Sequence, residues 1–164
     1  MNVDEAIPEE RPAVLTLTLE AYREYQVEGG PAFWERYCQN IRRSLLEGDP
    51  IILVARSDGA IKGSVLYCEP NQGAIANPYP EMRLLAVPPS SRNLGVGAML
   101  IEACEQRAKP AGVLTLHTTR LMQTARAMYE RRGYTRFTDI DFEPVPGFVV
   151  WGYQKTLTAG AGLG

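Results

Sequence analysis

Residues 82–97 read MRLLAVPPSSRNLGVG, and this stretch decides the fold. Its first six residues are mostly apolar and predict a buried central strand. Pro88 and Pro89 end that strand, because proline lacks the N–H group that a sheet requires. Beyond Gly97, apolar residues at helical spacing predict a helix that continues until Pro110 and Gly112, with Ala98, Leu100, Ile101, Ala103, Cys104 and Ala108 on one stripe. A strand is therefore expected to pass through a glycine-bearing turn into a helix.

The turn from Arg92 to Gly97 has the features of an anion site. The first N–H groups of a helix have no acceptor within the helix, and they lie at its positive end. Gly95 and Gly97 allow close backbone approach and positive φ, while Arg92 adds a positive charge. These features suit a pyrophosphate. A plain strand-to-helix turn that uses glycine for geometry alone would show the same residues.

Two other phosphate-binding motifs do not fit this turn. A dinucleotide fingerprint needs a third glycine where Leu100 stands. A P-loop needs Gly-Lys followed by Ser or Thr, which the chain lacks. Both motifs are excluded.

The rest of the chain alternates between helical and strand-like patterns. Two helices are predicted before any strong strand, at about residues 12–28 and 31–45. Strands at 51–56 and 61–67 around Ser57-Asp58-Gly59 predict a β-hairpin. Residues 71–80 are irregular in composition. The later elements are expected as a strand at 113–117, a helix at 122–132, and strands at 134–142 and 148–157 around a loop at 143–147.

Composition predicts one globular domain at residues 1–158, followed by a C-terminal tail at 159–164. The net charge of −2 excludes a general attraction for nucleic acid or for an anionic membrane surface. Three widely spaced cysteines and a single histidine predict neither a disulfide framework nor a metal site. The chain shows no signal peptide and no apolar stretch long enough to span a membrane, so a cytoplasmic location is expected.

Two motifs together resemble the GCN5-related N-acetyltransferase (GNAT) superfamily. The first is Leu85-Ala86-Val87-Pro88-Pro89 followed by Arg92-x-x-Gly95-x-Gly97, which matches the family's [RQ]-x-x-G-x-[GA] turn after a strand. The second is the family pattern A-x-x-x-Y-x-x-x-G-[FY], matched by Ala125, Tyr129, Gly133 and Tyr134. Two motifs in the correct order are more specific than either alone. The resemblance runs clearly from Glu81 to about Leu157.

The resemblance implies a mixed α/β fold. Its sheet is mostly antiparallel and twisted, with about six or seven strands, splayed central strands and about four flanking helices. It also implies acetyl-CoA as co-substrate, with no metal. The backbone of Leu85, Ala86 and Val87 would pair with the pantetheine arm. The pyrophosphate would be held by Arg92, Asn93, Leu94, Gly95, Val96, Gly97 and Ala98. Met122 stands where the family often has asparagine near the thiol, which predicts a more apolar acyl end.

Acetyl transfer to an amine requires a base, because a lysine-like amine is neutral in roughly one molecule in two thousand at pH 7. Glu81 is the candidate base, since it lies eleven residues before Arg92, as the glutamate does in the family's histone-acetylating branch. A charge exposed at a strand end is the other interpretation. His117, at the end of a predicted strand, is a weaker candidate for proton transfer, because a lone histidine is more often structural.

The departing thiolate calls for an acid, and the tetrahedral oxyanion calls for an N–H donor. By the resemblance, Tyr129 lies beside the sulfur and is the candidate acid; otherwise it packs in the core with Met128 and Tyr134. The amide of Val87 is the candidate oxyanion donor.

The resemblance predicts an N-acetyltransferase that moves acetyl from acetyl-CoA to a primary amine of a small molecule or peptide, directly within a ternary complex. A non-catalytic acyl-CoA-binding module is the alternative, and a nucleotide-binding domain is a third. Asp139, Asp141 and Glu143 could attract a cationic acceptor or simply form a solvated face. The apolar run at 148–151 permits a homodimer.

Overall fold

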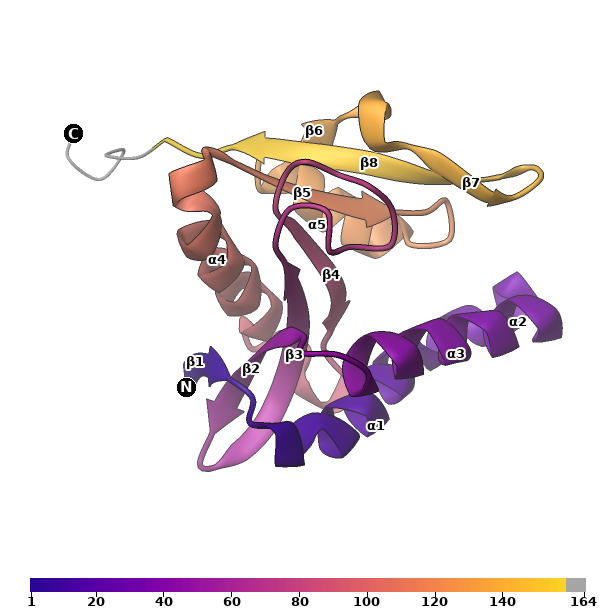
Figure 1. Cartoon of the computed structure of the whole chain (residues 1–164). Helices are drawn as coiled ribbons and strands as arrows, with labels where there is room; N and C mark the ends of the chain where they lie inside the picture. The colour runs from indigo at the N-terminus through magenta and orange to yellow at the C-terminus, as the bar shows by residue number, and fades with distance from the viewer. Residues whose placement is uncertain (159–164) are drawn as a thin grey trace. The chain divides into compact units, whose positions relative to one another are not determined.

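The computed structural model describes residues 1–158 (Figure 1). The predicted C-terminal tail, residues 159–164, lies outside the described residues. The described chain divides into two compact parts: a first part of residues 1–68 and 82–104, and a second part of residues 69–81 and 105–158. Strand β4 (Glu81–Ala86) and helix α4 (Val96–Ala108) each contribute residues to both parts.

The sheet of the first part contains strands β1 (Asn2–Glu5), β2 (Ile51–Ser57), β3 (Ala60–Cys68) and β4, in the order β1-β2-β3-β4. The predicted hairpin is confirmed, because β2 pairs antiparallel with β3. Asp58 and Gly59 both take positive φ, of 51° and 79°, as the tightest hairpin turns require. Residues 52–55 are all buried, which explains why β2 is an apolar run rather than an alternating strand.

Strand β1 was not predicted: the two helices were expected before any strong strand, and this short edge strand lies before both of them. Three of its four residues are exposed and only Val3 is half-buried, so the sequence of this segment has no alternation of apolar and polar residues. The strand exists because it pairs antiparallel with the edge of β2, where Val3 lies opposite Ala55. Arg56 of β2 also binds Asp4 through an ion pair of 2.8 Å.

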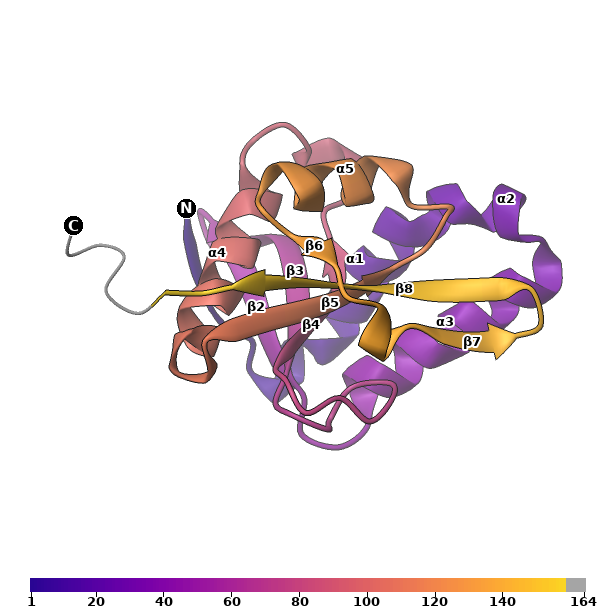
Figure 2. The same ribbon diagram turned by 90° about the horizontal axis from the view of Figure 1, so that it is seen from above.

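The helices of the first part are α1 (Arg11–Tyr22), α2 (Gln26–Gly29), α3 (Pro31–Leu46) and the start of α4. The helix predicted at 12–28 is interrupted by a 3₁₀ turn at Arg23–Tyr25. Gly30, with φ of 83°, separates α2 from α3. Helices α1 and α3 lie side by side (Figures 1 and 2), and the ring of Tyr22 stacks on that of Tyr37 at 5.7 Å.

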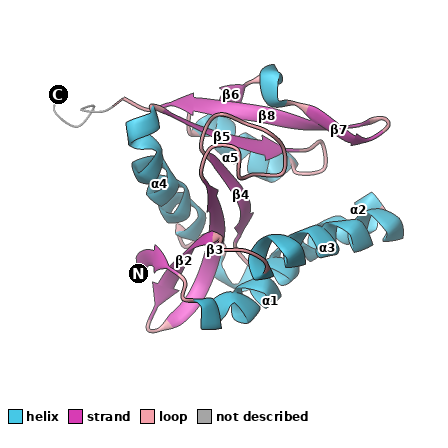
Figure 3. Cartoon of the chain, viewed as in Figure 1, coloured by secondary structure: helices cyan, strands magenta, loops and turns pink. Residues whose placement is uncertain are grey.

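The second part is built around strand β8 (Phe148–Thr156). It pairs antiparallel with β5 (Val113–Thr118), β6 (Thr135–Arg136) and β7 (Phe142–Val145). Helix α5 (Gln123–Arg131) connects β5 to β6 (Figure 3). Together the two parts confirm the predicted mixed α/β, mostly antiparallel architecture, with eight strands in the described chain.

The strand predicted at 134–142 was wrong. Only Thr135 and Arg136 pair as β6; a 3₁₀ turn follows at Thr138–Ile140, and β7 takes up part of the predicted loop at 143–147. Asp141 explains the fold-back, because it binds Arg136 at 2.7 Å and accepts the N–H of Gly152 at 2.6 Å. Such side-chain contacts carry no periodic signal in the sequence.

The cluster of Arg56 and Glu10 predicts an acid-sensitive contribution to stability. Arg56 donates to both carboxylate oxygens of Glu10, at 2.6 and 2.8 Å, and the Ile7 N–H donates to one of them. These contacts lower the pKa of Glu10 from 4.5 to about 2, with the Arg56 hydrogen bond as the largest cause. A lowered pKa in the folded state gives stability that is fully present above the unfolded pKa and is lost as pH falls through the folded pKa.

We therefore expect Glu10→Gln to reduce the free energy of unfolding by about 1 kcal/mol at pH 7, with the deficit vanishing between pH 4.5 and about 2. Urea unfolding of both proteins across that range measures the deficit. A deficit that stays constant down to pH 2 would refute the assignment.

Candidate functional site

The turn before α4 has the geometry of an anion site. Gly95 takes φ of 79°, and its carbonyl accepts the N–H of Met99 at 3.1 Å, so it caps the start of the helix. A Cβ built on Gly95 would meet no atom within 4 Å. The first N–H groups of α4 have no acceptor within the helix, as at any helix start. The free N–H groups at the start of α4 therefore lie next to Gly95, which leaves open space for a ligand.

The left-handed positions of this turn differ from the expectation. Asn93 takes φ of 65°, so it and Gly95 are the positive-φ residues of the turn. Gly97 was expected to share this role but lies within α4. Asparagine tolerates positive φ better than most residues, which is why a non-glycine residue occupies the first of the two positions.

Arg92 holds the turn in place. Its Nε donates to the carbonyl of Val87 at 3.0 Å, and its Nη2 contacts the carbonyl of Ala21 at 3.3 Å and Glu24 at 3.0 Å. The guanidinium thus connects the end of β4 and the end of α1 to the turn. It braces the turn, and its charge is shared with Glu24.

Strand β4 is irregular at its centre. Leu84 has φ of 53°, a left-handed conformation that costs a residue with a Cβ on the order of 1 kcal/mol. The next carbonyl, that of Leu85, accepts the hydroxyl of Tyr22 at 2.9 Å. Ala86 is buried, whereas Arg83, Leu84 and Leu85 are only half-buried, which is unusual for a central strand. The backbone is therefore distorted at Leu84, immediately before the Leu85–Val87 segment, and α1 holds that segment through the Leu85 carbonyl.

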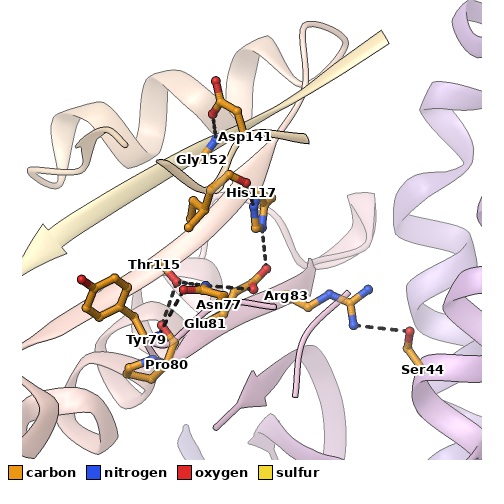
Figure 4. Close-up of polar contacts among 11 residues, drawn as sticks. Ser44, Asn77, Tyr79, Pro80, Glu81, Arg83, Thr115, His117, Asp141 and Gly152 are labelled. Atoms are coloured by element: carbon orange, nitrogen blue, oxygen red, sulfur yellow. Dashed lines mark hydrogen bonds and ion pairs between the residues drawn. The ribbon is translucent and has the colours of Figure 1, made fainter. Parts of the chain in front are cut away.

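A buried polar network organises the second part (Figure 4). Glu81 is 2% exposed, so the interpretation of this residue as a solvent-facing charge was wrong. Its Oε2 lies 2.7 Å from Nδ1 of His117, the single histidine of the chain. The Nε2 atom of His117 lies 2.8 Å from the carbonyl oxygen of Ile140. The candidate base and the weaker candidate for proton transfer are thus direct partners.

Asn77 and Thr115 complete this network, and sequence reasoning missed both. Asn77 is fully buried; its Nδ2 donates to Thr115 Oγ1 at 2.9 Å and contacts Glu81 Oε1 at 3.3 Å. Thr115 in turn donates to the carbonyl of Pro80 at 2.8 Å. A signal was present, since Thr115 and His117 are alternate polar residues in an apolar strand and so share one face. Asn77 lies in an irregular loop and gave no signal.

The residues expected at the thiol end lie at the start and on the inner face of α5. Tyr129 is 8% exposed, and its ring meets that of Tyr134 edge-on at 6.0 Å. Met122 precedes the helix as its N-cap and is 9% exposed. Within residues 1–158, the hydroxyl of Thr118 at the end of β5 is buried and has no hydrogen-bond partner. A buried orphan hydroxyl is rare and marks a place where a ligand can donate or accept.

The predicted site residues fall into two groups. The turn residues Arg92–Ala98 and the strand residues Leu85–Val87 belong to the first part, whereas Glu81, Met122 and Tyr129 belong to the second. Across the part of the chain that the structure describes, no cluster of His, Cys, Asp or Glu could hold a metal ion. In the same residues, no helix has the length and apolar character that crossing a bilayer demands.

Comparison with solved structures shows similar folds over nearly the whole chain. Apo YjaB from Escherichia coli matches with a TM-score of 0.73 and 17% identity, covering 96% of this chain and 98% of that one. A "histone acetyltransferase HPA2 and related acetyltransferase" from Corynebacterium glutamicum gives 0.71 and 19%, covering 98% of each chain. The PaiA N-acetyltransferase from Thermoplasma acidophilum in complex with coenzyme A gives 0.68 and 17%, covering 95% of this chain and 99% of that one.

No curated protein matches the sequence. The Acetyltransferase (GNAT) family matches residues 13–134, which is well over half of the chain and includes the turn, Glu81, His117 and Tyr129. The chain therefore belongs to the acetyltransferase (GNAT) family.

Proposed function

We propose that this protein is an N-acetyltransferase that moves the acetyl group of acetyl-CoA to a primary amine within a ternary complex. Membership of the family supports acyl transfer in general. The observation that carries the finer proposal is the turn at Arg92–Gly97. It combines the start of α4, two left-handed residues and a braced arginine in the manner of a pyrophosphate cradle.

The residues present fit coenzyme A in three respects. The N-terminal amides of α4 and the space beside Gly95 suit a pyrophosphate. The half-buried residues Leu85 and Val87, which follow the distorted backbone at Leu84, suit an extended pantetheine arm. The orphan hydroxyl of Thr118, four residues before Met122, suits a polar group near the acyl end. When bound, acetyl-CoA would supply an acetyl group activated as a thioester.

The chemistry assigns a role to each candidate. The amine nitrogen bonds to the acetyl carbonyl carbon, and the C–S bond breaks as the thiolate leaves. Tyr129 gives its phenolic proton to that thiolate, and the amide of Val87 donates to the carbonyl oxygen as negative charge develops on it. Glu81 receives the proton that the amine loses. Because Glu81 is 2% exposed, that proton reaches it through a bridging water.

The amine acceptor can be found by following thiol release from acetyl-CoA against polyamines, amino acids, aminoglycosides and lysine peptides. Turnover on any of these amines that requires Tyr129 supports the proposal. Tight acetyl-CoA binding by calorimetry with no turnover on the panel would favour the acyl-CoA-binding module, for which Met122 is the sequence hint. No binding of acetyl-CoA would refute both the transferase and the acyl-CoA-binding module. A melting temperature raised by ATP or NAD but not by acetyl-CoA would indicate a nucleotide-binding domain.

Arg92 provides a prediction about the cradle. We expect Arg92→Ala to weaken acetyl-CoA binding about tenfold, because the turn loses its contacts to Val87, Ala21 and Glu24. Arg92→Lys should weaken binding nearly as much, since an ammonium group cannot reproduce this fork of contacts. Calorimetric titration measures both variants, with Arg43→Ala, an exposed arginine on α3, as the control. Wild-type affinity in Arg92→Lys would show that charge alone matters.

Three further features are part of the proposal. We infer a single catalytic domain over residues 1–158, a cytoplasmic location, and a homodimer formed through the apolar segment at 148–151 of β8. Val149 in that segment is 39% exposed, which supports the dimer. Light scattering during size-exclusion chromatography tests the dimer, and a mass near 18.2 kDa at micromolar concentration would refute it.

A further inference from the structure

The two ring nitrogens of His117 both face hydrogen-bond acceptors. Nε2 lies 2.8 Å from the carbonyl oxygen of Ile140, and Nδ1 lies 2.7 Å from Oε2 of Glu81 (Figure 4). A backbone carbonyl can only accept, so Nε2 must carry a proton. In a neutral imidazole, Nδ1 would then be bare and would present its lone pair to a carboxylate.

A bare Nδ1 facing an ionised carboxylate at 2.7 Å is repulsive, so a proton must lie between them. The proton makes the pair either an imidazolium with a carboxylate or a neutral imidazole with a carboxylic acid. Three neighbouring features favour the ionic form. Asn77 donates toward the other oxygen of Glu81, the carbonyl of Ile140 accepts from the ring, and the carboxylate of Asp141 lies nearby, with its pKa lowered mainly by the hydrogen bond from Arg136 and least by the charge of His117.

The charges around the pair are otherwise balanced. Asp141 is bound by Arg136 at 2.7 Å, and the hydrogen bond from Arg136 is the largest cause of the lowered pKa of Asp141. The rings of His117 and Phe142 form a T-shaped contact with their centroids 5.2 Å apart. Glu81 is therefore the carboxylate in direct contact with the imidazole, with side-chain exposures of 2% and 9% for the two partners.

We propose that His117 is a positioning residue, held as an imidazolium between Glu81 and the Ile140 carbonyl, that keeps Glu81 ionised and fixed at the start of β4. The pair also ties three segments of the second part together: the loop that ends at Glu81, strand β5, and the 3₁₀ turn at Thr138–Ile140. The protonation state of His117 is independent of the proposed function. Only the consequence for catalysis rests on it, because that consequence requires Glu81 to be the base.

The consequence is that the proton between His117 and Glu81 is carried by the imidazolium, and the pair can take up one more proton. His117 has both nitrogens protonated and cannot accept another proton, whereas the carboxylate of Glu81 can. Between the two, Glu81 is the group able to take a proton from an amine through water. His117 holds the carboxylate of Glu81 through a charge-assisted hydrogen bond of 2.7 Å.

Nitrogen NMR tests the protonation state directly, because His117 is the single histidine in the chain and its signals need no assignment by mutation. In the wild type we expect both ring nitrogens to be protonated at pH 7.5, about one pH unit above the ordinary histidine pKa. In Glu81→Gln the side-chain amide can donate to Nδ1, so the ring should be neutral at pH 7.5 with its proton on Nε2. A wild-type ring with bare Nδ1 at pH 7 would overturn the proposal without any variant.

Asp141→Asn is the matched control, because it removes the other nearby carboxylate. We expect this variant to keep the imidazolium at pH 7.5, since Arg136 already neutralises Asp141. Loss of the imidazolium in Asp141→Asn, or its retention in Glu81→Gln, would show that Glu81 does not hold the proton, and would overturn the proposal.

Kinetics on an accepted amine tests the positioning role. In His117→Gln, the acid limb of the kcat/KM profile should move to higher pH, because the buried carboxylate loses its charged partner. The KM for acetyl-CoA should change by less than about twofold. A uniform loss of kcat at every pH would indicate a merely structural residue and would overturn the catalytic consequence. If the amine panel shows no turnover, the proposed function fails. The NMR experiment still decides whether His117 is an imidazolium.

Discussion

Replacing Tyr129 by phenylalanine should lower kcat about a hundredfold on any accepted amine, while the Kd for acetyl-CoA changes by less than about twofold. The change removes one hydroxyl and keeps the ring that packs against Tyr134 at 6.0 Å. Without that hydroxyl, the thiol of coenzyme A must leave as an unprotonated thiolate. A thiolate whose parent thiol has a pKa of about 8.5 is a moderate leaving group even without an acid, so some activity should remain.

Tyr134→Phe is the matched control for this experiment. Tyr134 is also buried, touches Tyr129, and donates its hydroxyl to Glu105 at 2.8 Å. Removing that hydroxyl should cost about 1 kcal/mol of stability and leave kcat nearly unchanged. Glu105 would retain its ion pair with Lys155 at 3.1 Å. If both variants lose activity equally at a temperature where both are folded, Tyr129 is a core residue and not the acid.

The largest stability loss is expected for Gly152→Ala, at about 3 kcal/mol or more. A Cβ at this position would clash with the Ile140 side chain and lie 2.5 Å from the carbonyl oxygen of Phe137. Because that carbonyl is a backbone group, no change of side-chain rotamer can remove the clash. The same glycine donates its N–H to Asp141 and accepts from Arg136, so moving it disturbs the whole fold-back of residues 137–141. Urea unfolding measures the loss.

Ile140→Ala separates the two sources of the Gly152 clash. In the double variant the side-chain clash is removed but the Phe137 carbonyl remains. The double variant should therefore be less stable than Ile140→Ala alone, by more than about 1 kcal/mol. Equal stability of the double variant and Ile140→Ala would show that the Phe137 carbonyl moves away without cost, so that the backbone contact does not explain the loss.

Local patterns predicted several features of the molecule well. Two prolines end β4, Gly95 takes the left-handed turn, and Leu100, Ile101 and Cys104 are fully buried on the stripe of α4. Each of these depends on residues close together in the chain, where backbone sterics and helical spacing act alone. The two family motifs added the fold class and the candidate residues for the same reason, because each lies within one short segment.

The contacts of Glu81 show where this reasoning stops. Its position eleven residues before Arg92 made it a candidate base, but nothing nearby in the chain indicates that it is buried. Its partner His117 is 36 residues away, and Asn77 reaches Thr115 across 38 residues. Sequence spacing cannot reveal such pairs, because only the completed packing decides which buried polar groups share a space.

The sequence by itself thus determined the strand, turn and helix of the candidate cradle, the fold class, and the identity of Tyr129 and Glu81 as candidates. Tertiary structure alone decided that the 2–5 segment pairs as a strand, that residues 137–141 fold back over Gly152, and that Glu81 is bound to His117. The physical reason is the range of the interactions. Turns, caps and helical stripes arise from neighbours in the chain, whereas edge pairing, glycine clearance and buried charge pairs arise from groups that meet only after the chain has folded.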